Sequence, residues 1–450
     1  MAAAAICACG GQVPRRAPRT TSTFSDLARA APSRLAQRGG SEKTTTTGKD
    51  RSTGGDPLTD AAGPLQRPID RALAHSGPEV GLLVQDLSTR QVLASRADTV
   101  ARPPASVEKL YTTVAALRLL GPQARLQTTV LGTGGLATGG VWHGNLYLHG
   151  GGDPTFGDGN WNRLYEGGHG PTALQLAEQL RRLGIRRVTG HIFADDSLFD
   201  TDPGGPATKD LADTPDYGGE MNALVYDHGM STARMSPAVF AAHELALTLR
   251  GLGMRVAAAS RTEPTPPAAV ELAHVESPPL SVLVRLMDVP SDDLIADLLA
   301  KQLGARLAAE GTLAAGAGQI RETLASDYGL HPTIFDGSGL DRADRTTPAE
   351  VVTLLRRMWK TPTGALLHAA LPIVGEQGTV SSIGLHSPAQ GNCVAKTGTL
   401  NGVTNLAGYC QARRGDTLAF AVMIDGPANW LSFAALSRFV AVVARYRATR

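Results

Sequence analysis

The sequence predicts an α+β fold, in which helices flank an antiparallel sheet and a strand-rich module interrupts the chain. Short apolar runs near both ends of the chain, at 79–94 and 393–424, predict the strands of that sheet. Apolar residues at helical spacing, at 106–120, 294–307 and 347–359, predict the helices. At 450 residues the chain is long enough for two or three domains.

The composition of residues 1–66 predicts a disordered tail or a targeting segment. The stretch 12–66 is rich in Arg, Thr, Ser, Gly and Pro and has no hydrophobic periodicity, so it cannot bury enough apolar surface to fold. The apolar run at 2–9 has no positive residue before it and no clear cleavage site, so it is a poor secretory signal. The Arg-containing stretch up to about Gly40 also resembles an organellar transit peptide.

The globular part begins near Ile69, and a strand-rich module interrupts it. A helix is expected to begin close to Ser106, directly after two prolines and an alanine. Strand-like pieces then occur at 127–131, 145–149 and 188–194, with one helix-like piece at 174–183. We therefore expect one domain formed by residues 67–135 and 277–450, and an inserted domain formed by residues 136–276.

Two local signals organise the C-terminal part. Thr347-Pro348-Ala349-Glu350 is a capping box with proline at the first helical position, which predicts the start of a helix. Asn401-Gly402 is the preferred pair of a type I′ turn, which predicts that the strand at 393–396 pairs antiparallel with the segment that follows. Counting outward from this turn places Cys393 opposite Cys410, so either a disulfide or two buried thiols would fit.

The composition and the missing motifs exclude several classes of function. The net charge of +2 gives no basic field of the kind that nucleic-acid-binding proteins show, so no nucleic acid is expected as a partner. No run approaches the roughly 18 apolar residues of a membrane helix, so no transmembrane span is expected. His243-Glu244 lacks the second histidine of a zinc protease, because Leu247 occupies its place. No metal, nucleotide or other cofactor is expected.

Ser106-Val107-Glu108-Lys109 is the only S-x-x-K segment in the chain. Residues three apart share one face of a helix, so the Lys109 amine can approach the Ser106 hydroxyl. A buried lysine beside another cation loses its proton more readily and can act as a base. Ser106 is therefore a candidate nucleophile and Lys109 a candidate base. An ordinary helix start with a solvated lysine would show the same pattern.

Lys396-Thr397-Gly398 is a second candidate motif, and it lies on a predicted strand. A cation, a hydroxyl and a glycine that allows close backbone approach suit an extended peptide that ends in a carboxylate. A solvated lysine before a turn is the alternative. The chain has only seven lysines, and two of them fall in these two motifs.

The two motifs occur in the order and setting found in penicillin-binding proteins and serine β-lactamases, with the nucleophile on a helix and K-T-G on a strand. The third expected element is S-x-N, which the chain lacks. Its best counterpart is Ser291-Asp292-Asp293, which lies between the other two. Ser291 could instead be the N-cap of the helix that follows.

Longer segments extend this resemblance to the D-alanyl-D-alanine carboxypeptidase/endopeptidase family of low-molecular-mass class C penicillin-binding proteins. They are residues 104–113 around Ser106, Gly150 to Pro154, Asp336 to Leu340 and Ala395 to Leu400. The resemblance covers residues 69–448 and implies a penicillin-binding/transpeptidase-like domain with an insertion after the first motif. It also implies peptidoglycan stem peptides as substrates, β-lactams as inhibitors and an extracytoplasmic location. Asp336 to Leu340 is expected to form a turn beside the site.

The resemblance also assigns roles to individual residues. By it, Ser106 attacks the penultimate D-Ala carbonyl, Lys109 takes its proton, and Ser291 relays a proton to the leaving amine. The expected substrate-binding residues are Asp293, Lys396, Thr397, Gly398 and Thr399. The backbone N–H groups of Ser106 and Thr399 would form the oxyanion hole. Asp293 stands where the family has asparagine, so an amide donor is lost and nearby lysines should stay charged, which predicts slow acylation.

Two other functions remain open. A β-lactamase or esterase would use the same serine, although no E-x-x-x-N or Y-x-N segment supplies the fast hydrolysis of the acyl-enzyme associated with those relatives. A non-catalytic peptidoglycan-binding protein would keep the fold and lose turnover, and Asp293 is the one sequence argument for it. Long-lived penicillin adducts would favour the peptidase.

Overall fold

The computed structural model describes residues 63–447, apart from residues 78, 205–218, 233, 260, 413–414 and 427–428 and the side chain of Trp430. The expected tail of residues 1–66 lies outside this part of the chain except for its last four residues. Leu65 is buried, and helix α1 (Gln66–Ala72) begins at Gln66. The folded part therefore begins before residue 67, because Leu65 packs into the same core as Ile69.

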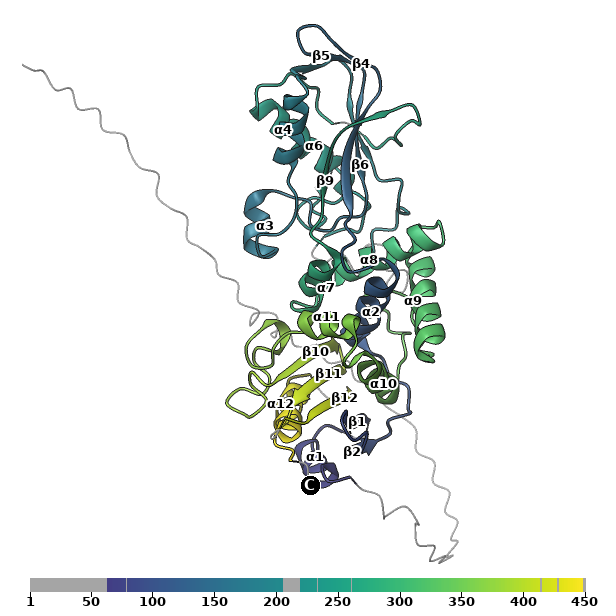
Figure 1. Cartoon of the computed structure of the whole chain (residues 1–450), viewed down its shortest axis with the longest axis vertical. Coiled ribbons are helices and arrows are strands. Elements are labelled where there is room, and N and C mark those ends of the chain that lie inside the picture. Colours follow the sequence, from purple (N-terminus) through teal and green to yellow (C-terminus); the bar gives the residue numbers. More distant parts are fainter. Residues whose placement is uncertain are drawn as a thin grey trace, which may run out of the picture. The chain divides into compact units, whose positions relative to one another are not determined.

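A five-stranded antiparallel sheet joins the two ends of the described chain (Figure 1). Its order is β10 (Cys393–Leu400), β11 (Val403–Gln411), β12 (Thr417–Asp425), β1 (Val80–Asp86) and β2 (Val92–Arg96). The N-terminal hairpin β1–β2 attaches to the C-terminal strands through the β1–β12 pair. Strands and helices from distant parts of the sequence thus form one domain, which confirms the α+β fold.

Both faces of this sheet are buried, so its central strands lack an alternation of apolar and polar residues. On one face, Val80, Leu82 and Val84 share a core with α1 and α12 (Asn429–Ala444). On the other face, Leu83 and Tyr409 share a core with the central helices. Successive side chains of a strand point to opposite faces, so one strand serves both cores.

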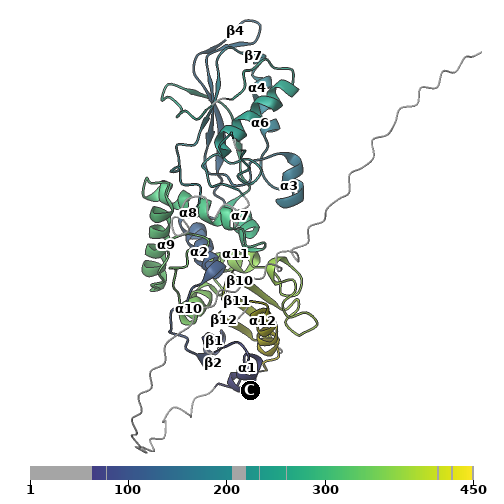
Figure 2. The ribbon, with the colours of Figure 1, turned by 180° about the vertical axis from the view of Figure 1, so that it is seen from behind.

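The central helices lie beside one another in both views (Figures 1 and 2). They are the 3-10 turn η2 (Ala105–Glu108) followed by α2 (Lys109–Leu119), then α7 (Leu280–Asp288), α8 (Asp293–Leu307), α9 (Leu313–Tyr328), α10 (Pro348–Met358) and α11 (Pro362–Ala370). Helix α8 is buried all round between residues 294 and 304. The expected capping box is present, with Thr347 and Glu350 bonding each other's backbone N–H groups. Within the described residues no helix is long and apolar enough to cross a membrane.

The middle of the chain builds two further sheets. One has the order β8 (Ile192–Asp195), β6 (Leu146–Gly150), β3 (Gln127–Gly132), β9 (Val270–Glu276), and the other the order β4 (Gly135–Ala137), β5 (Val141–His143), β7 (Arg187–Val188). Helices α4 (Ala173–Arg182) and α6 (Pro237–Gly251) share the core of the first sheet, and α3 (Gly159–Tyr165) lies nearby. A boundary at residue 136 would leave β3 outside this module. In the structure β3 pairs with β6 and β9, so β3 belongs to the same sheet as the middle of the chain. The expected strand 188–194 is two short strands.

The turn between β10 and β11 has the predicted register but not the predicted type. Leu400 pairs with Val403, and Cys393 pairs with Cys410. Gly402 has a φ of 79°, but Asn401 is not among the residues with positive φ, so the turn is not type I′. Cys393 and Cys410 form a disulfide.

Candidate active site

Ser106 and Lys109 lie at the start of the first central helix. Ser106 is in the 3-10 turn η2, and Lys109 is the first residue of α2, so the expected α-helix begins three residues later than Ser106. The spacing still brings Lys109 Nζ within 3.0 Å of Ser106 Oγ. Ala105, directly before Ser106, has a φ of 45°, a conformation that costs energy for a residue with a Cβ.

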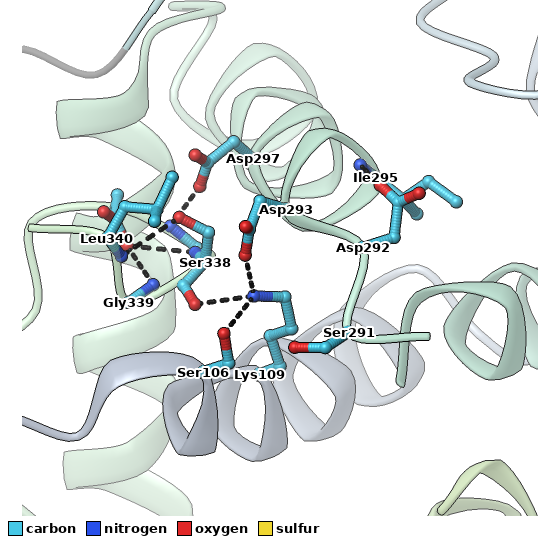
Figure 3. A network of polar contacts seen from close by, with 12 residues as sticks. Ser106, Lys109, Ser291, Asp292, Asp293, Ile295, Asp297, Ser338, Gly339 and Leu340 are labelled. Atoms are coloured by element: carbon cyan, nitrogen blue, oxygen red, sulfur yellow. Dashed lines mark hydrogen bonds and ion pairs between the residues drawn. The ribbon is translucent and has the colours of Figure 1, made fainter. Parts of the chain in front are cut away.

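Lys109 is fully buried and donates to three acceptors (Figure 3). These are Ser106 Oγ, the carboxylate of Asp293, and the carbonyl oxygen of Ser338 at 2.7 Å. An ammonium group has three protons and no lone pair, so this arrangement uses every donor of the charged form. Asp293 is the first residue of α8, and Ser338 lies in the glycine-rich turn expected beside the site.

Lys396 and Ser291 form a second pair. Lys396 Nζ donates to Ser291 Oγ at 2.7 Å and to the carbonyl oxygen of Thr397 at 3.0 Å. Burial, together with the positive charge of Lys109, lowers the pKa of Lys396 to about 7. Ser291 has a φ of 69°, a strained conformation of the kind that gathers at functional sites.

The N-cap of α8 is Asp292 and not Ser291, so the alternative of Ser291 as the cap is wrong. Asp292 accepts from the backbone N–H of Ile295 at 2.8 Å, which satisfies a free donor of the first turn. Its other oxygen is 2.7 Å from Nε2 of His228, a residue of the middle part of the chain. This cap fixes the direction in which the neighbouring Asp293 enters the site.

The K-T-G segment lies on the edge strand β10. Thr397 Oγ1 donates to Thr379 Oγ1 at 2.7 Å, and Thr399 is exposed. A Cβ on Gly398 would lie 2.4 Å from the carbonyl oxygen of Pro104 and 3.0 Å from the nitrogen of Val107. The expected close approach at this glycine is therefore to the Ser106 turn, because the strand packs directly on it.

Sequence reasoning missed a buried asparagine that supports the Ser106 turn. Asn405 on β11 is fully buried, and its Nδ2 donates to the carbonyl oxygens of Pro103 at 2.9 Å and Pro104 at 2.8 Å. Its Oδ1 accepts from the backbone N–H of Ile424 at 3.2 Å. A polar residue in the middle of an apolar strand was the available signal.

The segment from Asp336 to Leu340 forms the expected turn. Asp336 accepts from the backbone N–H groups of Ser338 at 2.9 Å and Gly339 at 2.6 Å. Asp297 on α8 accepts from the N–H of Gly337 at 2.7 Å. The two carboxylates hold the turn so that the Ser338 carbonyl faces Lys109, and Ser338 itself is fully buried.

Comparison with known proteins connects this geometry to one family. Residues 65–238 and 229–443 match the D-Ala-D-Ala carboxypeptidase 3 (S13) family. A D-alanyl-D-alanine carboxypeptidase of Actinomadura sp. (strain R39) is 27% identical, over 82% of this chain and 83% of that protein. Carboxypeptidase DacB of Mycolicibacterium smegmatis is 30% identical, over 83% of this chain and 84% of that protein.

Solved structures show the same fold. Penicillin binding protein 4 (dacB) from Haemophilus influenzae superposes with a TM-score of 0.71 at 22% identity, over 84% of this chain and 99% of that chain. A complex of that protein with a β-lactam superposes with a TM-score of 0.65, over 82% and 97% of the two chains. These likenesses confirm the expected penicillin-binding/transpeptidase-like fold. Because the family match spans most of the described chain, the chain belongs to the D-Ala-D-Ala carboxypeptidase 3 (S13) family.

Proposed function

We propose that this chain is a serine D-Ala-D-Ala carboxypeptidase that acts on peptidoglycan stem peptides through an acyl-enzyme on Ser106. The contact between Lys109 Nζ and Ser106 Oγ, at 3.0 Å, carries the proposal, because a base must lie within hydrogen-bond reach of the proton that it takes. The relatives named carboxypeptidases support the substrate class. The proposed domain that holds the site comprises the five-stranded sheet and the central helices.

In the acylation step, Ser106 Oγ bonds to the carbonyl carbon of the penultimate D-Ala. The hydroxyl proton passes to the free amine of Lys109, and the bond from that carbon to the nitrogen of the terminal D-Ala breaks. The leaving nitrogen takes a proton through Ser291, whose hydroxyl is bonded to Lys396. Water then attacks the ester on Ser106, which releases the shortened peptide and restores the hydroxyl.

Substrate binding is assigned to the edge strand and the start of α8. Lys396, Thr397 and Thr399 would hold the terminal carboxylate, which suits a cation and hydroxyls at a strand edge. The backbone N–H groups of Ser106 and Thr399 would receive the oxyanion, a contribution that is often among the largest to the rate. Gly398 keeps this strand against the Ser106 turn. Asp293 pairs with the base, which favours a slow enzyme.

The same proposal covers partners and location. Peptidoglycan peptides would be the substrates and β-lactams the covalent inhibitors, as the β-lactam complex of the Haemophilus influenzae protein suggests. An extracytoplasmic location agrees with the disulfide between Cys393 and Cys410, because disulfides persist in oxidising compartments.

Mass spectrometry after incubation with benzylpenicillin tests this function. The protein should gain the mass of one penicillin, and the adduct should persist and map to Ser106. Ser106→Ala should show no adduct, whereas Ser338→Ala, which removes the other serine beside Lys109, should still form one. An adduct on any other residue contradicts the assignment. Rapid release would indicate a β-lactamase, and no adduct at all would indicate a non-catalytic peptidoglycan-binding protein.

A further inference from the structure

Three buried carboxyl groups, one of them on the Ser106 turn itself, lie close together. Glu108, between Ser106 and Lys109 in the sequence, is fully buried, as are Asp336 and Asp344 to within a few per cent. One carboxyl oxygen of each lies within 4.8 Å of the others. The proposed reaction uses none of these three side chains.

The hydrogen-bond donors around this cluster are unevenly distributed. Both oxygens of Asp336 accept from backbone N–H groups, and Asp344 Oδ1 accepts from the N–H of Phe335 at 2.8 Å. Both oxygens of Glu108 and Oδ2 of Asp344 have no donor in the part of the chain that the structure describes. The nearby cation, Lys109, directs its protons to other acceptors.

Two ionised carboxylates cannot bond each other, since both are acceptors only. One carboxyl oxygen of Glu108 and one of Asp344 nevertheless lie within 4.8 Å of each other, and the two side chains interact as a hydrogen-bonded pair. We propose that Glu108 and Asp344 share one proton, and that the resulting hydrogen bond is a positioning device that holds the Ser106 turn against the segment 336–344. This inference rests on the proposed role of Ser106 as the nucleophile.

The charges around the pair favour retention of the proton. Burial raises the pKa of Glu108 well above its ordinary value, and the charges of Asp344, Asp336 and Asp297 add to that rise. Burial and the charge of Asp336 raise the pKa of Asp344 to about 9. Asp341 in the same segment and Tyr111, three residues after Glu108, also face the pair, and Lys109 on the turn's own helix faces Asp336 in the same cluster.

The shared proton would act on Ser106 through a tightly packed contact. A Cβ on Gly339 would lie 2.1 Å from the carbonyl oxygen of Ala105 and 3.1 Å from the Cβ of Glu108, so turn and segment touch. The same segment supplies the Ser338 carbonyl to Lys109. Loss of the proton would leave two adjacent buried carboxylates, whose repulsion separates turn and segment and displaces both Ser106 and Lys109.

The sign of the pH effect follows from the raised pKa values. A carboxyl group whose pKa is higher in the folded state takes up a proton on folding. Its contribution to stability is fully present below the ordinary pKa of a carboxyl group and is lost as the pH rises through the folded-state value. Both stability and acylation should therefore decline on the alkaline side.

Replacing one of the two acids by its amide keeps a hydrogen-bond donor between the two side chains without the titrating proton. In Glu108→Gln the amide donates to Asp344 at every pH, and in Asp344→Asn it donates to Glu108. The test compares acylation of Ser106 by penicillin at about pH 6 and about pH 10. Relative to Glu108→Gln, the wild type should lose about tenfold over this range, because the upper pH lies about one unit above the pKa of about 9 of Asp344 and one required proton is lost. An equal pH dependence in wild type and both amide variants overturns the proposal.

Asp153 supplies a matched control. It is a buried carboxyl group of the middle part of the chain whose pKa burial raises to about 7. Asp153→Asn should change the pH dependence of the free energy of unfolding while leaving the ratio of acylation rates at the two pH values as in wild type. The same shift in that ratio as in Glu108→Gln would make the effect one of general stability and overturn a positioning role.

Infrared spectroscopy gives a readout that does not need turnover. At about pH 8, above the pKa of about 7 of Asp153 and below the pKa of about 9 of Asp344, the wild type should show the carbonyl band of a buried protonated carboxylic acid, and Glu108→Gln should lose that band. If penicillin does not acylate the wild type at any pH but the band is present, the proposed function fails and the shared proton stands. If a chelator abolishes acylation and Mg²⁺ or Ca²⁺ restores it, a cation occupies the cluster and the shared proton is overturned.

Discussion

Lys109 at the start of α2 and Asp293 at the start of α8 form an ion pair, although they are 184 residues apart in the sequence. The same ammonium donates to the Ser106 hydroxyl that it is proposed to deprotonate. All its protons are engaged, so one must leave before Lys109 can act as a base. The carboxylate of Asp293 stabilises the charged form and thus opposes the first step of the proposed reaction.

Replacing Asp293 with asparagine should accelerate acylation. Loss of the carboxylate should increase the penicillin acylation rate constant at neutral pH by about tenfold, because the carboxylate stabilises the charged form of the amine that must take the Ser106 proton. Stopped-flow measurement of both proteins at neutral pH checks this expectation.

Asp292 provides the control for that experiment. Asp292→Asn makes the same chemical change one residue earlier, where the side chain contacts Ile295 and His228 instead of Lys109. Asparagine is also a good N-cap, so α8 should keep its start. Similar acceleration in both variants, or none in Asp293→Asn, would show that the ion pair does not limit acylation.

The charge of Lys396 should make peptide binding depend on pH. Burial and Lys109 lower its pKa to about 7, so its positive charge is lost as the pH rises through neutrality. The KM for a peptide ending in D-Ala-D-Ala should increase by about tenfold between about pH 6 and about pH 8, because the substrate carboxylate loses its cation. Lys396→Arg stays charged, so its KM should be nearly independent of pH. Steady-state kinetics of the two proteins decide the point, and a flat wild-type KM would contradict it.

The disulfide should stabilise the site-bearing hairpin. Cys393 and Cys410 are 17 residues apart, so removing the bridge should lower the free energy of unfolding by about 3 kcal/mol. Urea unfolding of the wild type and of a double Cys→Ser variant measures the difference. Thiol titration of the unfolded, unreduced protein should find both cysteines unreactive, and two reactive thiols would contradict the bridge.

Local signals in the sequence predicted the elements that short-range chemistry determines. The capping box at Thr347 and the register of the β10–β11 hairpin are examples, because each depends on neighbouring residues. The pairing of β1 with β12 could not be read in this way, since it joins segments more than 300 residues apart. Helix α6 was missed although Ser236-Pro237 is a start signal, because many small residues blur its apolar periodicity.

In the site, too, residues in short motifs could be predicted, whereas contacts between distant segments could not. Ser106, Lys109, Ser291 and Lys396 stand in short motifs, and the structure pairs Ser106 with Lys109 and Ser291 with Lys396, close enough that the charge of Lys109 lowers the pKa of Lys396. The carbonyl of Ser338 could not be predicted as a partner of Lys109, because backbone groups carry no sequence signature. The pairing of Glu108 with Asp344 likewise appears only when distant segments pack together.

Asn405 should be required for the position of the Ser106 turn. Its amide is the donor for the carbonyl oxygens of Pro103 and Pro104, immediately before Ala105 and Ser106. Asn405→Ala leaves these buried acceptors and the Ile424 N–H unpaired, which should lower the free energy of unfolding by about 1–3 kcal/mol. Acylation of Ser106 should slow as well, because the strained turn loses its anchor.

Asn405→Asp and Asn392→Ala separate the anchor from general stability. A carboxylate at position 405 can still accept from Ile424 but cannot donate to the prolines, so acylation should fall about as far as in Asn405→Ala. Asn392 is exposed and also donates to two backbone carbonyls, those of Pro388 and Gln390, but it lies away from Ser106. Its alanine variant should acylate at the wild-type rate. Urea unfolding and penicillin acylation of all three variants test the idea, and wild-type acylation by both Asn405 variants would refute an anchoring role.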